Sequence, residues 1–341
     1  MGCAAYQAGN LLGALSGLAL FGTLRQSLAL LLLGAVCSGL LWLGSFRAIA
    51  PFLGVIVAFM GLTFLYVSVR IDVDPGDLLQ AGLIPRFPEG STLLIISLIG
   101  TTIVPYNLFL ASGISRDQTV REMRWGIVLA VLIGGLISLA ILVVGTSVRG
   151  LFSFESLAQA LAGRLGSWST AFFGLGLFAA GLSSSITAPL AAAVTGQSLF
   201  GADNPAWSTH SRNFRLVWGA VLATGLFFGT LDVQPIPAII LAQAVNGLLL
   251  PVITVFLVLA VNDRDLMPVE YTNSALNNGL MLLIVGATCF LGLNNIWKAV
   301  RRLFPALGDG TAAIAVNLGL SALLLVALGW QLYRSDASDR A

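Results

Sequence analysis

The chain has 341 residues, of which 57% are hydrophobic and only 9% are charged, and its formal net charge is +2. Soluble domains carry roughly 25% charged residues, so this composition excludes a soluble globular protein and indicates an integral membrane protein. The near-neutral charge gives no sign of nucleic-acid binding. No nucleophile–base pair or cofactor motif is visible, so we expect neither enzyme activity nor a bound cofactor.

A membrane-spanning helix needs about 20 mostly apolar residues. Segments of this kind cover, in chain order, 4–22, 28–45, 48–69, 92–114, 126–148, 168–198, 214–231, 235–261, 273–295 and 312–333. Residues 152–164 predict a short amphipathic or re-entrant helix before the sixth segment. We therefore expect a multi-pass protein of the cell (inner) membrane in contact with lipid, while its oligomeric state and orientation stay open.

A proline interrupts the fourth predicted span, in the stretch Gly-Thr-Thr-Ile-Val-Pro-Tyr-Asn-Leu at 100–108. Pro105 removes a backbone donor and clashes with the preceding turn. An unpaired backbone group in hydrocarbon costs several kcal/mol, so broken helices are tolerated where they line a cavity or a site. The break before Asn107 therefore predicts a binding site.

Other polar side chains inside predicted spans are either ligands or ordinary helix–helix hydrogen-bonding groups. They are Gln7, Asn10, Ser183 to Ser185, Thr187, Gln197, Gln243, Asn246 and Asn317. The acidic residues fall in connections or at span ends, so the spans lack the carboxylate that a dication or proton path commonly uses. Asp74-Pro75-Gly76-Asp77 looks like a metal motif, but Asp-Pro-Gly is common turn chemistry and we predict a turn.

Residues 100–112, Gly-Thr-Thr-Ile-Val-Pro-Tyr-Asn-Leu-Phe-Leu-Ala-Ser, resemble the sixth membrane helix of the Nramp family of divalent metal transporters. That family carries Gly-Ala-Thr-Val-Met-Pro-His-Asn-Leu-Tyr-Leu-His-Ser there. Stretches at 78–85 and 180–187, and then Gln243, Leu250-Pro251 and 262–267, agree with the family in the same order. The departures resemble the divergent, Nramp-related branch.

The resemblance implies an all-α polytopic membrane protein with a leucine-transporter-type inverted-repeat fold of about ten helices. In this register the spans correspond to family helices three to twelve, so we expect the first two helices to be absent. The family's first helix carries the metal-binding Asp-Pro-Gly-Asn. A single transporter domain, 1–341, would hold the rest of the first repeat at 1–70, the second repeat at 91–261 and two extra helices at 273–333.

The resemblance also implies a metal site. The Thr101 carbonyl, Asn107 and Gln243 occupy ligand positions, and Val104 replaces a methionine sulfur beside the helix break at Pro105. Because a thioether selects softer ions, its loss weakens the case for iron or manganese over magnesium. For proton coupling, Tyr106 and Ala111 replace the family's histidines, and Tyr6 or Gln7 replaces an acidic residue.

The leading hypothesis is a secondary transporter of divalent cations by alternating access, with magnesium or manganese favoured before iron. The metal ion would be the transported substrate and not a cofactor. One alternative is a carrier of a small, amino-acid-like organic solute on the same fold, which a neutral, amide-rich site would suit. The other is a non-transporting truncated fragment.

Overall fold

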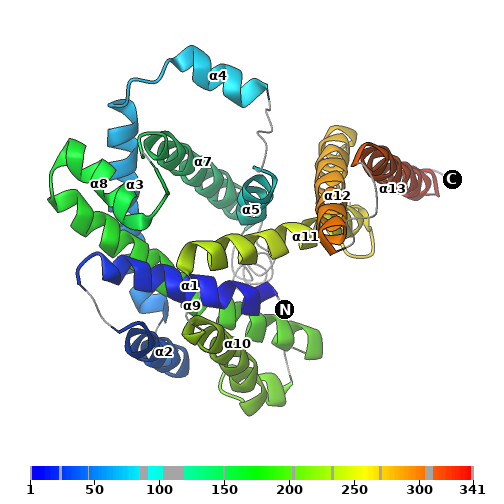
Figure 1. Ribbon diagram of the computed structural model, residues 1–341. Helices are drawn as coiled ribbons and strands as arrows, with labels where there is room; N and C mark the ends of the chain where they lie inside the picture. Colours follow the sequence, from blue (N-terminus) through cyan, green and yellow to red (C-terminus); the bar gives the residue numbers. More distant parts are fainter. Residues whose placement is uncertain are drawn as a thin grey trace. The chain divides into compact units, whose positions relative to one another are not determined.

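The regular secondary structure is helical throughout the part of the chain that the structure describes (Figure 1). This computed structural model describes residues 2–22, 25–44, 46–84, 91–102, 119–148, 150–201, 204–231, 234–268, 271–303 and 310–338. Helices suit so apolar a chain, because each helix pairs its own N–H and C=O groups without water.

The helices follow the predicted spans closely. They are α1 (Gly2–Ala19), α2 (Gln26–Leu43), α3 (Phe46–Val69), α4 (Pro75–Leu83), α5 (Thr92–Thr102), α7 (Val120–Gly145), α8 (Phe154–Leu165), α9 (Trp168–Phe200), η2 (Pro205–Trp207), α10 (Arg212–Thr230), α11 (Pro235–Asn262), α12 (Ala275–Leu303) and α13 (Gly310–Ser338). Every predicted span coincides with a helix except the fourth, of which the structure describes 92–102 as α5. The short helix predicted at 152–164 is confirmed as α8.

Six helices are long and apolar enough to cross a membrane, counting only described residues. They are α2, α3, α7, α9, α12 and α13.

Polar capping groups mark where several helices begin. At α7, Thr119 and Glu122 form a reciprocal capping box, in which the Thr119 N–H donates to the Glu122 carboxylate at 2.8 Å.

The Asp74–Asp77 segment begins a helix, so the predicted turn is wrong. The Asp74 carboxylate accepts a hydrogen bond from the Gly76 N–H at 2.7 Å and caps α4. Pro75 occupies the first helical position, where a missing N–H costs nothing. Asp-Pro-Gly is thus a helix start here. Within the described residues no group of three or more His, Cys, Asp or Glu side chains is placed to hold a metal.

Contacts divide the chain into two units. The first unit comprises 1–90 and 106–242, and the second unit comprises 91–105 and 243–341. Helix α11 supplies residues to both units, because the division falls between Ala242 and Gln243. The predicted repeat boundaries at 1–70, 91–261 and 273–333 concern ancestry and stay a prediction.

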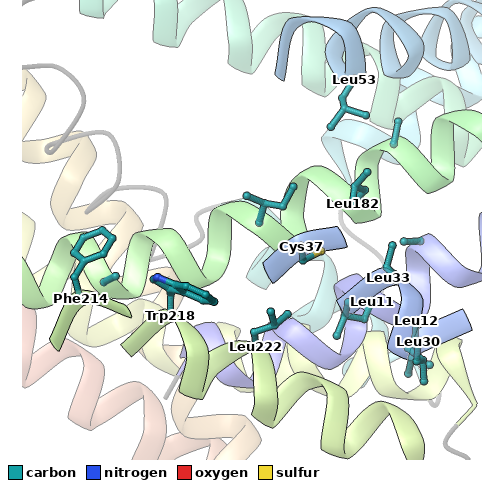
Figure 2. Packing of buried hydrophobic residues seen from close by; sticks show 14 residues of the cluster. Leu11, Leu12, Leu30, Leu33, Cys37, Leu53, Leu182, Phe214, Trp218 and Leu222 are labelled. Atoms are coloured by element: carbon teal, nitrogen blue, oxygen red, sulfur yellow. The ribbon is translucent and has the colours of Figure 1, made fainter. Parts of the chain in front are cut away.

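The main core of the first unit lies where α1, α2, α9 and α10 meet (Figure 2). Leu12, Leu30 and Cys37 are buried there with Leu182 and Leu222. A second cluster joins α3, α7, α8 and α9, and it includes an edge-on contact of two phenylalanine rings whose centroids are 5.7 Å apart.

Small residues let α1 and α9 approach closely. A Cβ atom added to Gly17 on α1 would lie 2.5 Å from the carbonyl oxygen of Gly174 on α9. Glycine at such crossings allows backbones to pack in the absence of a hydrophobic drive between helices in lipid. The register between α1 and α9 is therefore fixed sterically.

The second unit packs the later part of α11 against α12, and α12 against α13. Val258, Val285 and Leu328 form a small buried cluster. Two polar contacts join α11 to α12. The hydroxyl oxygens of Thr254 and Thr288 are 3.2 Å apart, and the amides of Asn262 and Asn278 bond to each other reciprocally at 2.7 and 2.9 Å.

Candidate functional site

Thr101 lies in the last described turn of α5, and its hydroxyl and its backbone carbonyl differ in their hydrogen bonding. Its hydroxyl donates to the Leu98 carbonyl at 2.6 Å, so the side chain is occupied within its own helix. The Thr101 carbonyl would need the N–H of residue 105 to continue the helical pattern. Residue 105 is a proline, which has no N–H. The carbonyl that the resemblance makes a ligand therefore lacks its helical donor.

Five predicted site residues lie outside the described residues: Val104, Pro105, Tyr106, Asn107 and Ala111. Their roles stay predictions. Gln243 lies on α11 with a half-buried side chain, and it belongs to the same unit as Thr101. Helix α11 continues through Pro251. The role of Gln243 as a second wall of the site stays a prediction.

A second proline explains why a glutamine is buried in α1. Pro189 lies inside α9, so the Ser185 carbonyl has no N–H four residues on. The Gln7 Nε2 atom of α1 donates to that carbonyl at 2.8 Å (both helices are labelled in Figure 1). Both Gln7 and Ser185 are fully buried. A side chain of one helix thus supplies the donor that proline removes from another.

A neighbouring contact strengthens the same helix pair. Asn10 Nδ2 donates to the Ser184 carbonyl at 3.2 Å. Gln7 and the half-buried Asn10 thus both form helix–helix hydrogen bonds, as one of the two interpretations of these amides expects. The proposed coupling role of Gln7, or of the buried Tyr6 beside it, stays a prediction.

Gln7 still carries unused hydrogen-bonding capacity. Its Oε1 atom and the Ser185 hydroxyl are buried without a hydrogen-bond partner among the described residues. On the α10 side, a Cβ atom added to Gly225 would collide with Gln7 Cγ and Cβ. The glutamine is therefore held between α9, which it bonds, and α10, which leaves room for it only because residue 225 is glycine.

The sequence profile described as "Nramp: Natural resistance-associated macrophage protein-like" matches residues 1–298. The chain belongs to the Nramp family. Several Nramp relatives carry the name divalent metal cation transporter MntH. The protein from Acidiphilium cryptum is 28% identical over 84% of this chain, that from Verminephrobacter eiseniae 27% over 70%, and that from Mycobacterium tuberculosis 30% over 54%. The chain spans 68%, 57% and 45% of the lengths of these three relatives.

A solved structure shares the fold. The crystal structure of a mutant of the Eremococcus coleocola manganese transporter aligns with a TM-score of 0.64 and 19% identity, covering 99% of this chain and 78% of that one. The predicted fold class, an all-α, multi-pass membrane protein of the leucine-transporter type, is confirmed by this likeness together with the Nramp match. The chain is accordingly an integral membrane protein.

Proposed function

We propose that this Nramp-family chain transports divalent metal cations by alternating access. The observation that carries the proposal is the family match over residues 1–298. Relatives named as divalent metal cation transporters and a structural neighbour described as a manganese transporter support the same substrate class. We favour Mn²⁺ or Mg²⁺ as the transported ion.

The proposed ion site contains oxygen ligands only. They are the Thr101 carbonyl and the side-chain amide oxygens of Asn107 and Gln243. Oxygen donors suit Mg²⁺ and Mn²⁺. Val104 supplies no sulfur, which removes a reason to prefer softer ions. Carbonyls at the C-terminal end of a helix carry partial negative charge, so the end of α5 would attract a cation without any carboxylate.

The direct test is uptake by the purified chain in liposomes, with Mn²⁺ and Mg²⁺ supplied separately. We expect metal uptake above that of empty liposomes, and we expect it to fall in Asn107→Ala and Gln243→Leu. Asn277→Ala is a matched control, because Asn277 is an exposed asparagine on α12. Its uptake should equal that of the unmodified chain.

Two outcomes would contradict the proposal. A folded, monodisperse chain whose uptake equals that of empty liposomes would favour the non-transporting alternative. Uptake or calorimetric binding of amino acids in place of either metal would favour the organic-solute carrier. Equal losses in Asn107→Ala and Asn277→Ala would leave transport intact as a function but remove Asn107 from the site.

A further inference from the structure

A pocket of about 690 Å³ lies between the end of α2 and the beginning of α10, within the first unit. Its lining combines a basic group, His210, Arg212 and Arg215, with the apolar residues Trp42 and Trp218 and with Gly219. It shares no residue with the proposed ion site. Its chemistry therefore needs an explanation of its own.

The basic side of the pocket is arranged to bind an anion. None of the described residues that line it is acidic. The Arg215 guanidinium lies over the Trp42 ring, 3.8 Å from the ring centroid. Stacking of this kind fixes the plane of the guanidinium and leaves its N–H edge available for a bidentate bond to a phosphate. Arg212 is the first residue of α10, where the helix end adds partial positive charge.

The other side of the pocket is suited to hydrocarbon. Trp218, Gly219 and Ala220 line it along α10. A Cβ atom added to Gly219 would meet nothing within 4 Å, so the space beside this part of α10 is open. Trp42 is 55% exposed, which fits a tryptophan at the boundary between lipid tails and headgroups. The pocket thus places a cationic rim next to an apolar groove.

We propose that this pocket binds an anionic phospholipid. The phosphodiester would bond Arg212 and Arg215, with His210 at the rim, and an acyl chain would lie along α10 over Gly219. Basic pockets between membrane helices bind acidic lipid headgroups by the same attraction. A free phosphate would satisfy the arginines but would leave the apolar half of the pocket uncovered, so the combined lining favours a lipid.

The test measures the binding of phosphatidylglycerol and phosphatidylcholine to the purified chain in detergent by native mass spectrometry. We expect the unmodified chain to prefer phosphatidylglycerol. The double variant Arg212→Gln/Arg215→Gln should lose about 25-fold in affinity for it, or about fivefold for each charge. The control Arg121→Gln/Arg124→Gln removes two exposed arginines of α7 and should change the affinity less than about twofold.

Two further variants and a competition with phosphate separate the contribution of charge from that of the stacking on Trp42. Trp42→Leu keeps both charges but removes the stacking partner, and it should weaken binding about two- to fivefold. Arg212→Lys/Arg215→Lys keeps both charges and should retain most of the preference. If the double glutamine variant does not fold, Arg215→Gln alone replaces it, with an expected loss of about fivefold. Inorganic phosphate at millimolar concentration should not displace the lipid.

Three results would overturn the proposal. The first is equal binding of the two lipids to the unmodified chain. The second is equal loss in the pocket variant and the α7 control. The third is full displacement of the lipid by inorganic phosphate, which would make the pocket a simple phosphate site.

Discussion

Replacing Gln7 with leucine tests whether α1 supplies the hydrogen-bond donor that Pro189 removes from α9. In the unmodified chain Gln7 Nε2 donates to the Ser185 carbonyl at 2.8 Å, and Pro189 cannot donate to it. Removing one partner of a buried hydrogen bond costs about 1–3 kcal/mol, but hydrogen bonds between membrane helices average about 0.6 and reach about 1.7 kcal/mol. Leucine also removes the unpaired Oε1 atom, which offsets part of the loss. We expect Gln7→Leu to lower the free energy of unfolding by about 1 kcal/mol.

A double-mutant cycle isolates the cause. Pro189→Ala restores an N–H that the Ser185 carbonyl can use within α9. In that background Gln7→Leu should cost close to nothing, giving a coupling energy of about 1 kcal/mol between residues 7 and 189. The measurement is reversible unfolding in mixed micelles, followed by circular dichroism as the fraction of sodium dodecyl sulfate rises.

Asn10 provides the matched control. It bonds the Ser184 carbonyl, whose helical donor four residues on is Ala188 and is therefore present. Asn10→Leu should cost less than Gln7→Leu and should cost the same with or without Pro189→Ala. If Gln7→Leu costs the same in both backgrounds, within about 0.3 kcal/mol, the proline is not the reason for the buried glutamine and the reasoning fails.

Three further predictions concern the packing of α10 and the proposed ion site. Gly225→Ala should lower the free energy of unfolding by about 1–3 kcal/mol through overpacking against Gln7, whereas Gly219→Ala, on an open face of the same helix, should leave it nearly unchanged. Pro105→Ala restores a donor to the Thr101 carbonyl and should reduce metal uptake about tenfold, a change of about 1.4 kcal/mol, whereas Thr101→Val removes only the hydroxyl and should stay within about twofold. Val104→Met introduces a thioether and should shift competition assays toward Cd²⁺ and Mn²⁺ over Mg²⁺.

Each of these predictions has a clear contrary result. Equal stabilities of the two α10 glycine variants would mean that the close contact is relaxed without cost. Greater loss in Thr101→Val than in Pro105→Ala would assign the ligand to the hydroxyl and not to the carbonyl. An unchanged ion preference in Val104→Met would show that residue 104 does not face the ion.

The positions of the spans were predictable because each apolar run is about as long as the bilayer is thick, and charge gathers between the runs. The ends differed by a few residues, because polar capping groups such as Thr119 decide where a helix begins. Helix α4 was missed for a related reason. Asp74-Pro75-Gly76 satisfies the chemistry of a turn and of a helix start equally well, and only the residues that follow distinguish them.

Contacts between residues of different helices were harder to predict from the sequence. The sequence places Pro189 four residues after Ser185, and that spacing identifies a carbonyl in need of a donor. It does not identify the donor, because Gln7 and Asn10 are equally polar and the register of α1 against α9 is set by glycine contacts. The stacking of Arg215 on Trp42 joins residues from two helices, and no local pattern marks it. For the proposed metal site, the sequence alone places Pro105 four residues after Thr101, so the Thr101 carbonyl is predicted to lack its helical donor.

The bond between Gln7 and Ser185 also constrains how the molecule can move. Sliding α1 along α9 by one turn in one direction would bring Cys3 to the position of Gln7 and take the amide donor away from the Ser185 carbonyl. Sliding it in the other direction would bring the Phe21 side chain to the position of Gly17, where α9 leaves no room for a side chain. Each direction therefore loses one of the two contacts that hold α1 against α9. We therefore expect these two helices to move as one rigid body in the proposed transport cycle. If the chain works by the proposed alternating access, the hinge of that movement should lie outside the contact between α1 and α9.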